Sequence, residues 1–275
     1  GLGSTDMKGF LALAATAAAR FQAGQLREPL VLIGTADEET GMEGAQMLLE
    51  TGRPKARHAV IGEPTGMRPI RPHNGILMEA IRINGRAGHS RNPALGTNAI
   101  EGMARVIEAL RGLQNELRET FNDPVFAVNH PTLNVGHICG GDAPNRIPAL
   151  CDLHIDLRFL PGMSIEDLRE RIHRAAQTAV DGTDYGLDVH PLFDGTPAHG
   201  CDAAAAICRA AEQLTGHNAG AVDFATEAGY FGALGMDTII MGPGDTDCAH
   251  PPARYTRPRP LDPTSHQPAR RRPRV

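Results

Sequence analysis

The sequence has no tryptophan, and aromatic residues make up only 4% of its 275 residues. Because proteins that bind single-stranded nucleic acid stack the bases on aromatic side chains, we expect no nucleic-acid partner of that kind. No uninterrupted apolar stretch approaches the length needed to cross a bilayer, so we expect no membrane span. The five cysteines are scattered, odd in number and without a Cys-x-x-Cys pair. This pattern predicts reduced thiols in a cytoplasmic protein rather than a disulfide framework or a zinc ribbon.

Charge is distributed unevenly along a chain whose hydrophobic content, 41%, is ordinary for a globular protein. The net charge is −5, yet residues 254–275 hold seven Arg against one Asp, interspersed with Pro. This segment has no apolar periodicity, so we predict a disordered tail. A basic tail on an acidic body also fits nucleic-acid contact, which would bind with strong salt dependence.

Both ends of the sequence lead us to expect a longer or different native protein. The chain starts at Gly1 without Met, already inside a pattern typical of a strand leading into a loop. Apolar patterning also stops just after His250. We therefore expect a truncated front and an aberrant ending.

Strands and helices alternate in the first and last parts of the chain. Ala- and Leu-rich or amphipathic patterns predict helices over 10–22, 43–50 and 202–214, and short apolar runs predict buried strands over 30–33 and 59–61. This alternation indicates βαβ units and therefore an α/β domain with a parallel sheet.

The middle of the chain follows a different pattern, in which apolar and polar residues alternate. Strands are predicted over 77–83, 132–138, 150–159 and 187–192, with helices over 98–117 and from Ser164 onward. The order β-α-β-β-α-β is the ferredoxin-like arrangement, with one sheet face covered by helices and one facing water. We predict an α+β domain over 72–193 inserted into a parallel-sheet domain formed by 1–71 and 194–253, followed by the tail at 254–275.

Acidic and imidazole side chains occur where apolar runs give way to Gly, Pro or Thr. They are Asp6, Glu38, Glu39, Glu63 and His250. Side chains at the carboxyl ends of neighbouring parallel strands converge on one crevice. Oxygen and imidazole ligands gathered there suit zinc or a similar divalent ion, and a spare carboxylate would serve as a base. The sequence therefore predicts a metallohydrolase.

Each of these residues also has an ordinary explanation when it is taken alone. Asp6 fits a turn or a helix cap, and the pair Glu38 and Glu39 fits a solvated first helical turn. Glu63 fits a loop charge, and His250 is one of twelve histidines. Only their joint occurrence, in this order, favours a metal site.

That order resembles the M20-type zinc hydrolases, a family of deacylases, aminoacylases and carboxypeptidases. The resemblance runs from Gly1 to about His250. It is carried by Ser-Thr-Asp-Met-Lys-Gly at 4–9, Thr-Ala-Asp-Glu-Glu-Thr at 35–40, Ile-Gly-Glu-Pro-Thr at 61–65 and Cys-Ala-His-Pro at 248–251.

The resemblance implies a role for each residue of the set. Asp6 is expected to touch two metals, zinc or cobalt, and Glu38 to act as the general base. Glu39 and His250 would bind one metal, and Glu63 the other. Relatives supply a further ligand from a His-x-Asp segment upstream of the Asp6 loop, which this chain does not contain. We therefore expect two metals per active site in the complete enzyme and one in this chain.

Within the family, residues 136–148 and 152–163 look most like the acetylornithine deacetylase group. The resemblance implies that His89 reaches the partner subunit's active site in a homodimer, and that Asn145 and Arg158 bind polar groups of the substrate. His89 also fits a surface histidine on a hairpin, and Arg158 also fits a plain charge on a strand surface.

The expected reaction is metal-dependent hydrolysis of the N-acyl amide of a small amino acid, with N-acetyl-L-ornithine as the expected substrate. Two alternatives remain open. One is another amidohydrolase of the family, such as succinyl-diaminopimelate desuccinylase. The other is a catalytically incompetent fragment that retains dimerisation.

Overall fold

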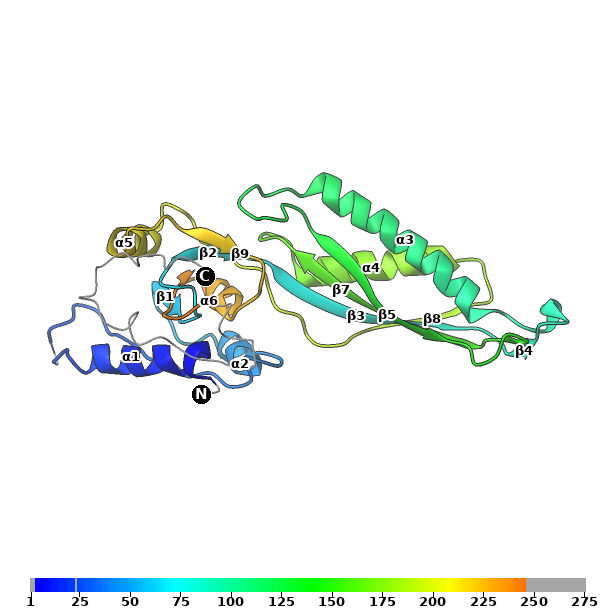
Figure 1. Ribbon diagram of the computed structural model, residues 1–275, viewed down its shortest axis with the longest axis horizontal. Helices are drawn as coiled ribbons and strands as arrows, with labels where there is room; N and C mark the ends of the chain where they lie inside the picture. The colour runs from blue at the N-terminus through cyan, green and yellow to red at the C-terminus, as the bar shows by residue number, and fades with distance from the viewer. Residues whose placement is uncertain (1–2, 23, 246–275) are drawn as a thin grey trace, which may run out of the picture.

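A computed structural model describes residues 3–22 and 24–245 (Figure 1). Its described strands form two four-stranded sheets and one two-stranded ribbon. Figure 1 shows the two sheets at opposite ends of an elongated molecule, each with its own helices. None of the helices in the described ranges is long and apolar enough to cross a membrane.

The first sheet is assembled from segments far apart in the sequence, in the order β1-β10-β2-β9. Its strands are β1 (His58–Ile61), β10 (Asp237–Ile240), β2 (Ile70–His73) and β9 (Gly220–Val222). The pairs β1–β10 and β2–β9 are parallel, whereas β10 and β2 are antiparallel. The helices of this part are α1 (Gly9–Ala18), α2 (Glu43–Thr51), α5 (Ala206–Thr215) and α6 (Ala228–Ala233). Apolar side chains of β1, β2, β10 and α6 form its main core.

The strand predicted at 30–33 is absent, and this prediction was wrong. Leu30, Val31 and Leu32 are 54%, 55% and 51% exposed, and no described strand pairs with them. An apolar run becomes a strand only when a neighbouring strand satisfies its backbone hydrogen bonds. Ile33 alone packs against the core of the first sheet.

The second sheet confirms the ferredoxin-like order predicted for the inserted part. Along the chain, β3 (Gly75–Asn84), α3 (Ala99–Thr120), β5 (Thr132–Gly140), β7 (Leu150–Phe159), α4 (Ile165–Val180) and β8 (Gly186–Pro191) follow one another. The sheet order is β5-β7-β3-β8, with every neighbouring pair antiparallel. The helices α3 and α4 lie side by side on one face of this sheet (Figure 1).

Alternation along β7 explains why this sheet has one dry and one wet face. Leu153, Ile155 and Leu157 are at most 2% exposed and pack with residues of α3 and α4. Their polar neighbours on β7 point to the other face and are partly exposed. Asn98 caps α3 by accepting the backbone N–H of Ile100 at 3.0 Å. The inserted part therefore has a hydrophobic core of its own.

The chain passes between the two sheets at two adjacent crossings. On the way out, β2 ends at His73 and β3 begins at Gly75, with only Asn74 between them. On the way back, Thr196 pairs with Ile76 and His199 pairs with His73. Two neighbouring extended segments therefore connect the two parts, and the candidate site lies on the first-sheet side of this junction.

Candidate active site

Glu63 follows β1 after a single residue, Gly62, and is held there by a glycine-rich loop. The Met67 N–H donates to the Gly242 carbonyl at 2.9 Å, so the loop after β10 lies against the end of β1. A Cβ atom at Gly242 would collide with the carbonyl oxygens of Gly62 and Glu63. Glycine is therefore required at position 242 for this close approach.

Glu38 and Glu39 lie in a tight turn that precedes α2. The carbonyl of Asp37 accepts the N–H groups of Thr40, Gly41 and Met42 at 3.2, 3.1 and 2.7 Å, which closes the turn. Glu38 is half-buried and Glu39 is exposed. The two adjacent carboxylates therefore face different surroundings, as two residues with different roles would.

Asp6 lies in the helical turn η1 (Ser4–Lys8) that precedes α1, and it is half-buried. This turn contacts the same glycine-rich loop as Glu63, because Thr5 lies directly beside Gly244. The turn before α1, the end of β1 and the loop after β10 thus meet in one place.

The pKa values of these carboxylates agree with their being close to one another. Glu63 is only 6% exposed, and burial followed by repulsion from Glu38, Asp6, Glu227 and Glu39 raises its pKa to about 9. Burial, followed by repulsion from Glu39, Asp6 and Glu227, raises the pKa of Glu38 to about 7. The structure therefore brings together the four carboxylates predicted from the sequence.

A fifth carboxylate, Glu227, was missed by sequence reasoning. It stands directly before α6, is 4% exposed and hydrogen-bonds to the Thr35 side chain. Burial raises its pKa. The available signal was its place in Phe-Ala-Thr-Glu-Ala at 224–228, where a charged residue stands among small and apolar ones.

The five carboxylates fit a divalent cation by their chemistry. None of them takes part in an ion pair with a described Lys, Arg or His, so no cationic side chain of the described residues offsets their mutual repulsion through an ion pair. Clustered carboxylate oxygens are ligands that a divalent ion favours and neutralises. Within the described ranges no three acidic, His or Cys side chains already stand in a coordinating arrangement. The predicted ligand His250 lies outside the described residues, as does the tail predicted at 254–275.

His89 and Asn145 lie far from the carboxylates of the same chain. His89 is in β4 (Gly88–His89), which pairs with β6 (Arg146–Ile147) at the end of the molecule farthest from α1 (Figure 1). The Asn145 carbonyl accepts the N–H of Ser90 at 3.0 Å, so the structure brings these two predicted residues together. It does not bring either of them to the carboxylate cluster.

Arg158 lies on β7, opposite Ile76, close to the crossing between the two sheets. Its Nε donates to both carboxylate oxygens of Asp156, at 3.0 and 3.1 Å. It is therefore partnered within its own strand, as a strand-surface charge would be.

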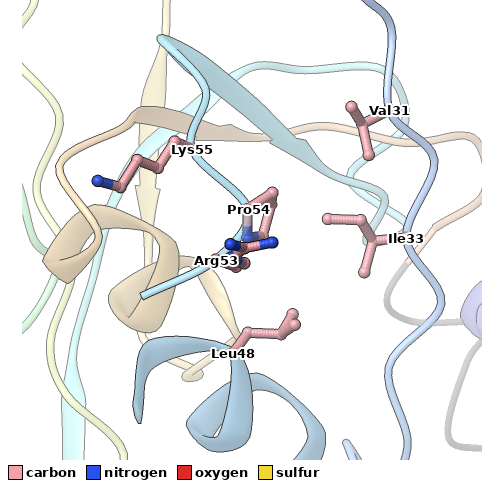
Figure 2. A pocket seen from close by; sticks show the side chains of 6 residues that line it. All are labelled: Val31, Ile33, Leu48, Arg53, Pro54 and Lys55. Atoms are coloured by element: carbon pink, nitrogen blue, oxygen red, sulfur yellow. The ribbon is translucent and has the colours of Figure 1, made fainter. Parts of the chain in front are cut away.

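A hollow of the described surface lies elsewhere. Figure 2 shows Val31 and Ile33 on one side, Leu48 of α2 below, and the turn at 53–55 opposite. It has a volume of about 620 Å³ and an almost wholly apolar lining without any carboxylate. It therefore lacks the carboxylate, imidazole and thiol groups that bind a metal.

Comparisons with known proteins agree with this architecture. A family profile described as "Peptidase dimerisation domain", from the M20 group, matches residues 72–184. The acetylornithine deacetylase of Edwardsiella ictaluri (strain 93-146) is 42% identical over 255 residues, and that of Proteus mirabilis (strain HI4320) is 40% identical over the same length. The chain belongs to the M20 family. Each alignment covers 93% of this M20 chain and 66% of the relative, so the chain spans just under two thirds of the relatives' length.

Solved structures share the fold at low sequence identity. A putative aminohydrolase from methicillin-resistant Staphylococcus aureus has a TM-score of 0.61 at 15% identity. The alignment covers 79% of this M20 chain and 59% of the aminohydrolase chain. A tripeptidase from Staphylococcus aureus subsp. aureus Mu50 has a TM-score of 0.58 at 17% identity, with coverages of 76% and 54%. Membership of the M20 family implies a divalent metal ion, in keeping with the carboxylate cluster.

Proposed function

We propose that this chain carries the active-site carboxylates of a metal-dependent amidohydrolase that cleaves N-acetyl-L-ornithine into L-ornithine and acetate. The observation that carries the proposal is the convergence of Asp6, Glu38, Glu39 and Glu63, two of which have strongly raised pKa values. The substrate is inferred from the 42% identity to an acetylornithine deacetylase. The odd number of scattered cysteines favours a cytoplasmic setting.

The proposed domain arrangement follows the two sheets. Residues 1–71 and 194–253 would form the domain that holds the carboxylates, and 72–193 would form the inserted domain. The latter contains the residues matched by the dimerisation profile, which supports a homodimer. The distal position of His89 fits a residue that serves the site of a second copy.

The proposed chemistry assigns separate tasks to the residues. Asp6, Glu39, Glu63 and His250 would hold zinc or cobalt, which would polarise the acyl carbonyl and acidify the attacking water. Glu38 would accept the proton of that water and pass it to the leaving amine. His89 of the partner subunit would donate to the developing oxyanion, and Arg158 and Asn145 would contact polar groups of the substrate.

Replacing the proposed base tests this assignment. In the zinc-loaded chain, Glu38→Gln is expected to lower the turnover of N-acetyl-L-ornithine by about 10² to 10⁴, the usual contribution of general acid–base catalysis. Its zinc content should stay unchanged, because Glu38 is not a proposed ligand. The matched control is Glu50→Gln, which alters an exposed residue of α2.

Three results would contradict the proposal. Wild-type turnover in Glu38→Gln would remove the base from the mechanism. Faster hydrolysis of N-succinyl-diaminopimelate than of N-acetyl-L-ornithine would replace the substrate. If the zinc-loaded wild-type chain hydrolyses neither compound, the alternative of a catalytically incompetent fragment that retains dimerisation is favoured.

A further inference from the structure

Three buried side-chain atoms of the described chain have no hydrogen-bond partner: His73 Nε2, Asn74 Oδ1 and Glu227 Oε1. Their residues are 0%, 6% and 4% exposed. His73 ends β2 and Asn74 precedes β3, so both lie at the crossing between the sheets. Glu227 stands directly before α6, and the backbone of its neighbour Thr226 lies beside the His73 ring. We call these three residues the junction cluster.

All three unpartnered atoms of the junction cluster are hydrogen-bond acceptors. The Nδ1 atom of His73 lies 2.8 Å from the Asn74 carbonyl oxygen and therefore carries the ring proton, so Nε2 presents a lone pair. Burial lowers the pKa of His73 to about 4, which keeps the ring neutral at pH 7. Amide and carboxylate oxygens are acceptors by their chemistry.

Leaving buried acceptors unpaired is costly, at about 1–3 kcal/mol for each group. Three of them around one crossing therefore indicate a place that receives donors from outside the described chain. Burial disfavours the ionised form of the Glu227 carboxylate, and a positively charged donor would favour that form, whereas neutral donors would not compensate its charge. A primary ammonium group matches both requirements, since it has three N–H donors and one positive charge.

The position of Glu227 relates such a ligand to the candidate active site. Glu227 is close enough to Glu38 and Glu63 to affect their ionisation, and its side chain also bonds to that of Thr35. A ligand with its ammonium group at Glu227 could therefore reach Glu38 with an amide a few bonds away. In an N-acyl ornithine, a three-carbon side chain separates the amine from the carbon that bears the amide.

We propose that the junction cluster of His73, Asn74 and Glu227 is a specificity subsite that binds the side-chain ammonium group of a basic N-acyl amino acid. Glu227 supplies the opposite charge, and His73 and Asn74 supply neutral acceptors. This assignment rests on the proposed amidohydrolase function, and it adds the reason for preferring a basic side chain over an apolar one.

The experiment compares the binding of L-ornithine and L-norvaline to the zinc-loaded chain by isothermal titration calorimetry. Norvaline has the same carbon skeleton as ornithine without the terminal amine, so the ratio of the two affinities reports the ammonium contact alone. A hydrogen-bonded charged group contributes roughly 10- to 100-fold in affinity. The wild-type chain is expected to prefer ornithine by such a factor, and Glu227→Gln is expected to lose most of this preference without weakening norvaline.

Two further variants serve as comparisons for this result. Asn74→Leu removes one neutral acceptor and is expected to reduce the preference by less than Glu227→Gln does. Glu166→Gln also removes a carboxylate from a helix start, that of α4, but from an exposed position far from the junction, and it should keep the wild-type ratio. Circular dichroism of each variant checks that the secondary structure is intact.

Several outcomes would overturn the subsite. These are equal affinity of the wild-type chain for the two amino acids, no measurable binding of either, an unchanged preference in Glu227→Gln, or loss of zinc in that variant. The hydrolysis rates of N-acetyl-L-ornithine and N-acetyl-L-norvaline distinguish an error in the subsite from an error in the proposed function. If both substrates are hydrolysed and Glu227→Gln slows both reactions equally, the amidohydrolase function is supported and the subsite is contradicted. If neither substrate is hydrolysed while ornithine binding still depends on Glu227, the subsite is supported and the proposed activity is contradicted.

Discussion

Replacement of Glu63 by Gln is expected to change how the stability of the metal-free first-sheet region depends on pH. Folded Glu63 keeps its proton up to about pH 9, whereas the unfolded side chain loses it near 4.5. Between these values the folded state binds more protons than the unfolded state, so the free energy of unfolding falls as pH rises. The stabilising proton is fully present below 4.5 and is lost as pH rises through the folded pKa.

The size of the effect follows from one proton. A single group changes the free energy of unfolding by at most about 1.4 kcal/mol per pH unit, or about 3 kcal/mol between pH 7 and pH 9. The buried histidines do not obscure this window. His73 and His199 have lowered pKa values, so their contribution changes only below their ordinary value of 6.5. Gln has nearly the shape of Glu and no charge, so Glu63→Gln should remove the contribution of Glu63 to the slope.

Amide hydrogen exchange of β1 and β10, read by mass spectrometry in the presence of a chelator, measures this local stability. Comparing variant with wild type at each pH cancels the intrinsic pH dependence of exchange. Exchange in the wild-type chain should accelerate between pH 7 and pH 9 relative to Glu63→Gln, and excess zinc should reverse the difference. Equal slopes for wild type, Glu63→Gln and the exposed control Glu50→Gln would refute the reasoning that Glu63 is buried among like charges.

Two further substitutions test how local sequence positions these elements. Asn98→Ala should cost about 1 kcal/mol in thermal unfolding because it removes the cap of α3, whereas Asn115→Ala, at an exposed position of the same helix, should cost much less. Gly242→Ala should lower zinc retention, because its methyl group would push the loop away from the end of β1. Gly112→Ala, where a Cβ atom would meet no neighbour, should instead stabilise α3 by about 0.5–1 kcal/mol.

Elements with their own periodicity were predicted well from the sequence. The alternation in β7 and the apolar stripe of α3 each predict which face of the element is buried. In both elements the predicted face is the buried one in the structure. The cap at Ser164 was equally visible, and its hydroxyl accepts the N–H of Asp167 at 3.0 Å. Such features depend on neighbours within a few residues or on a regular pattern, so local sequence is enough to predict them.

The apolar run at 30–33 shows the limit of that reasoning. Its composition is that of a strand, but a strand also needs a hydrogen-bonding neighbour, and composition does not tell whether one is present. Glu227 shows the same limit for the site. Nothing within its helix reveals that Glu38 and Glu63 lie nearby, because the turn before α2, the end of β1 and the start of α6 are distant in sequence.

The sequence by itself therefore determined the two-part α/β architecture, the ferredoxin-like order of the insertion and four of the five clustered carboxylates. These follow from hydrophobic periodicity and from recognisable short segments. Only the tertiary structure decided which groups are buried together, and hence the raised pKa values of Glu38 and Glu63 and the unpartnered acceptors of the junction cluster. Burial and the distance between charges depend on how separate segments pack, and these two quantities control ionisation and unmet hydrogen bonding.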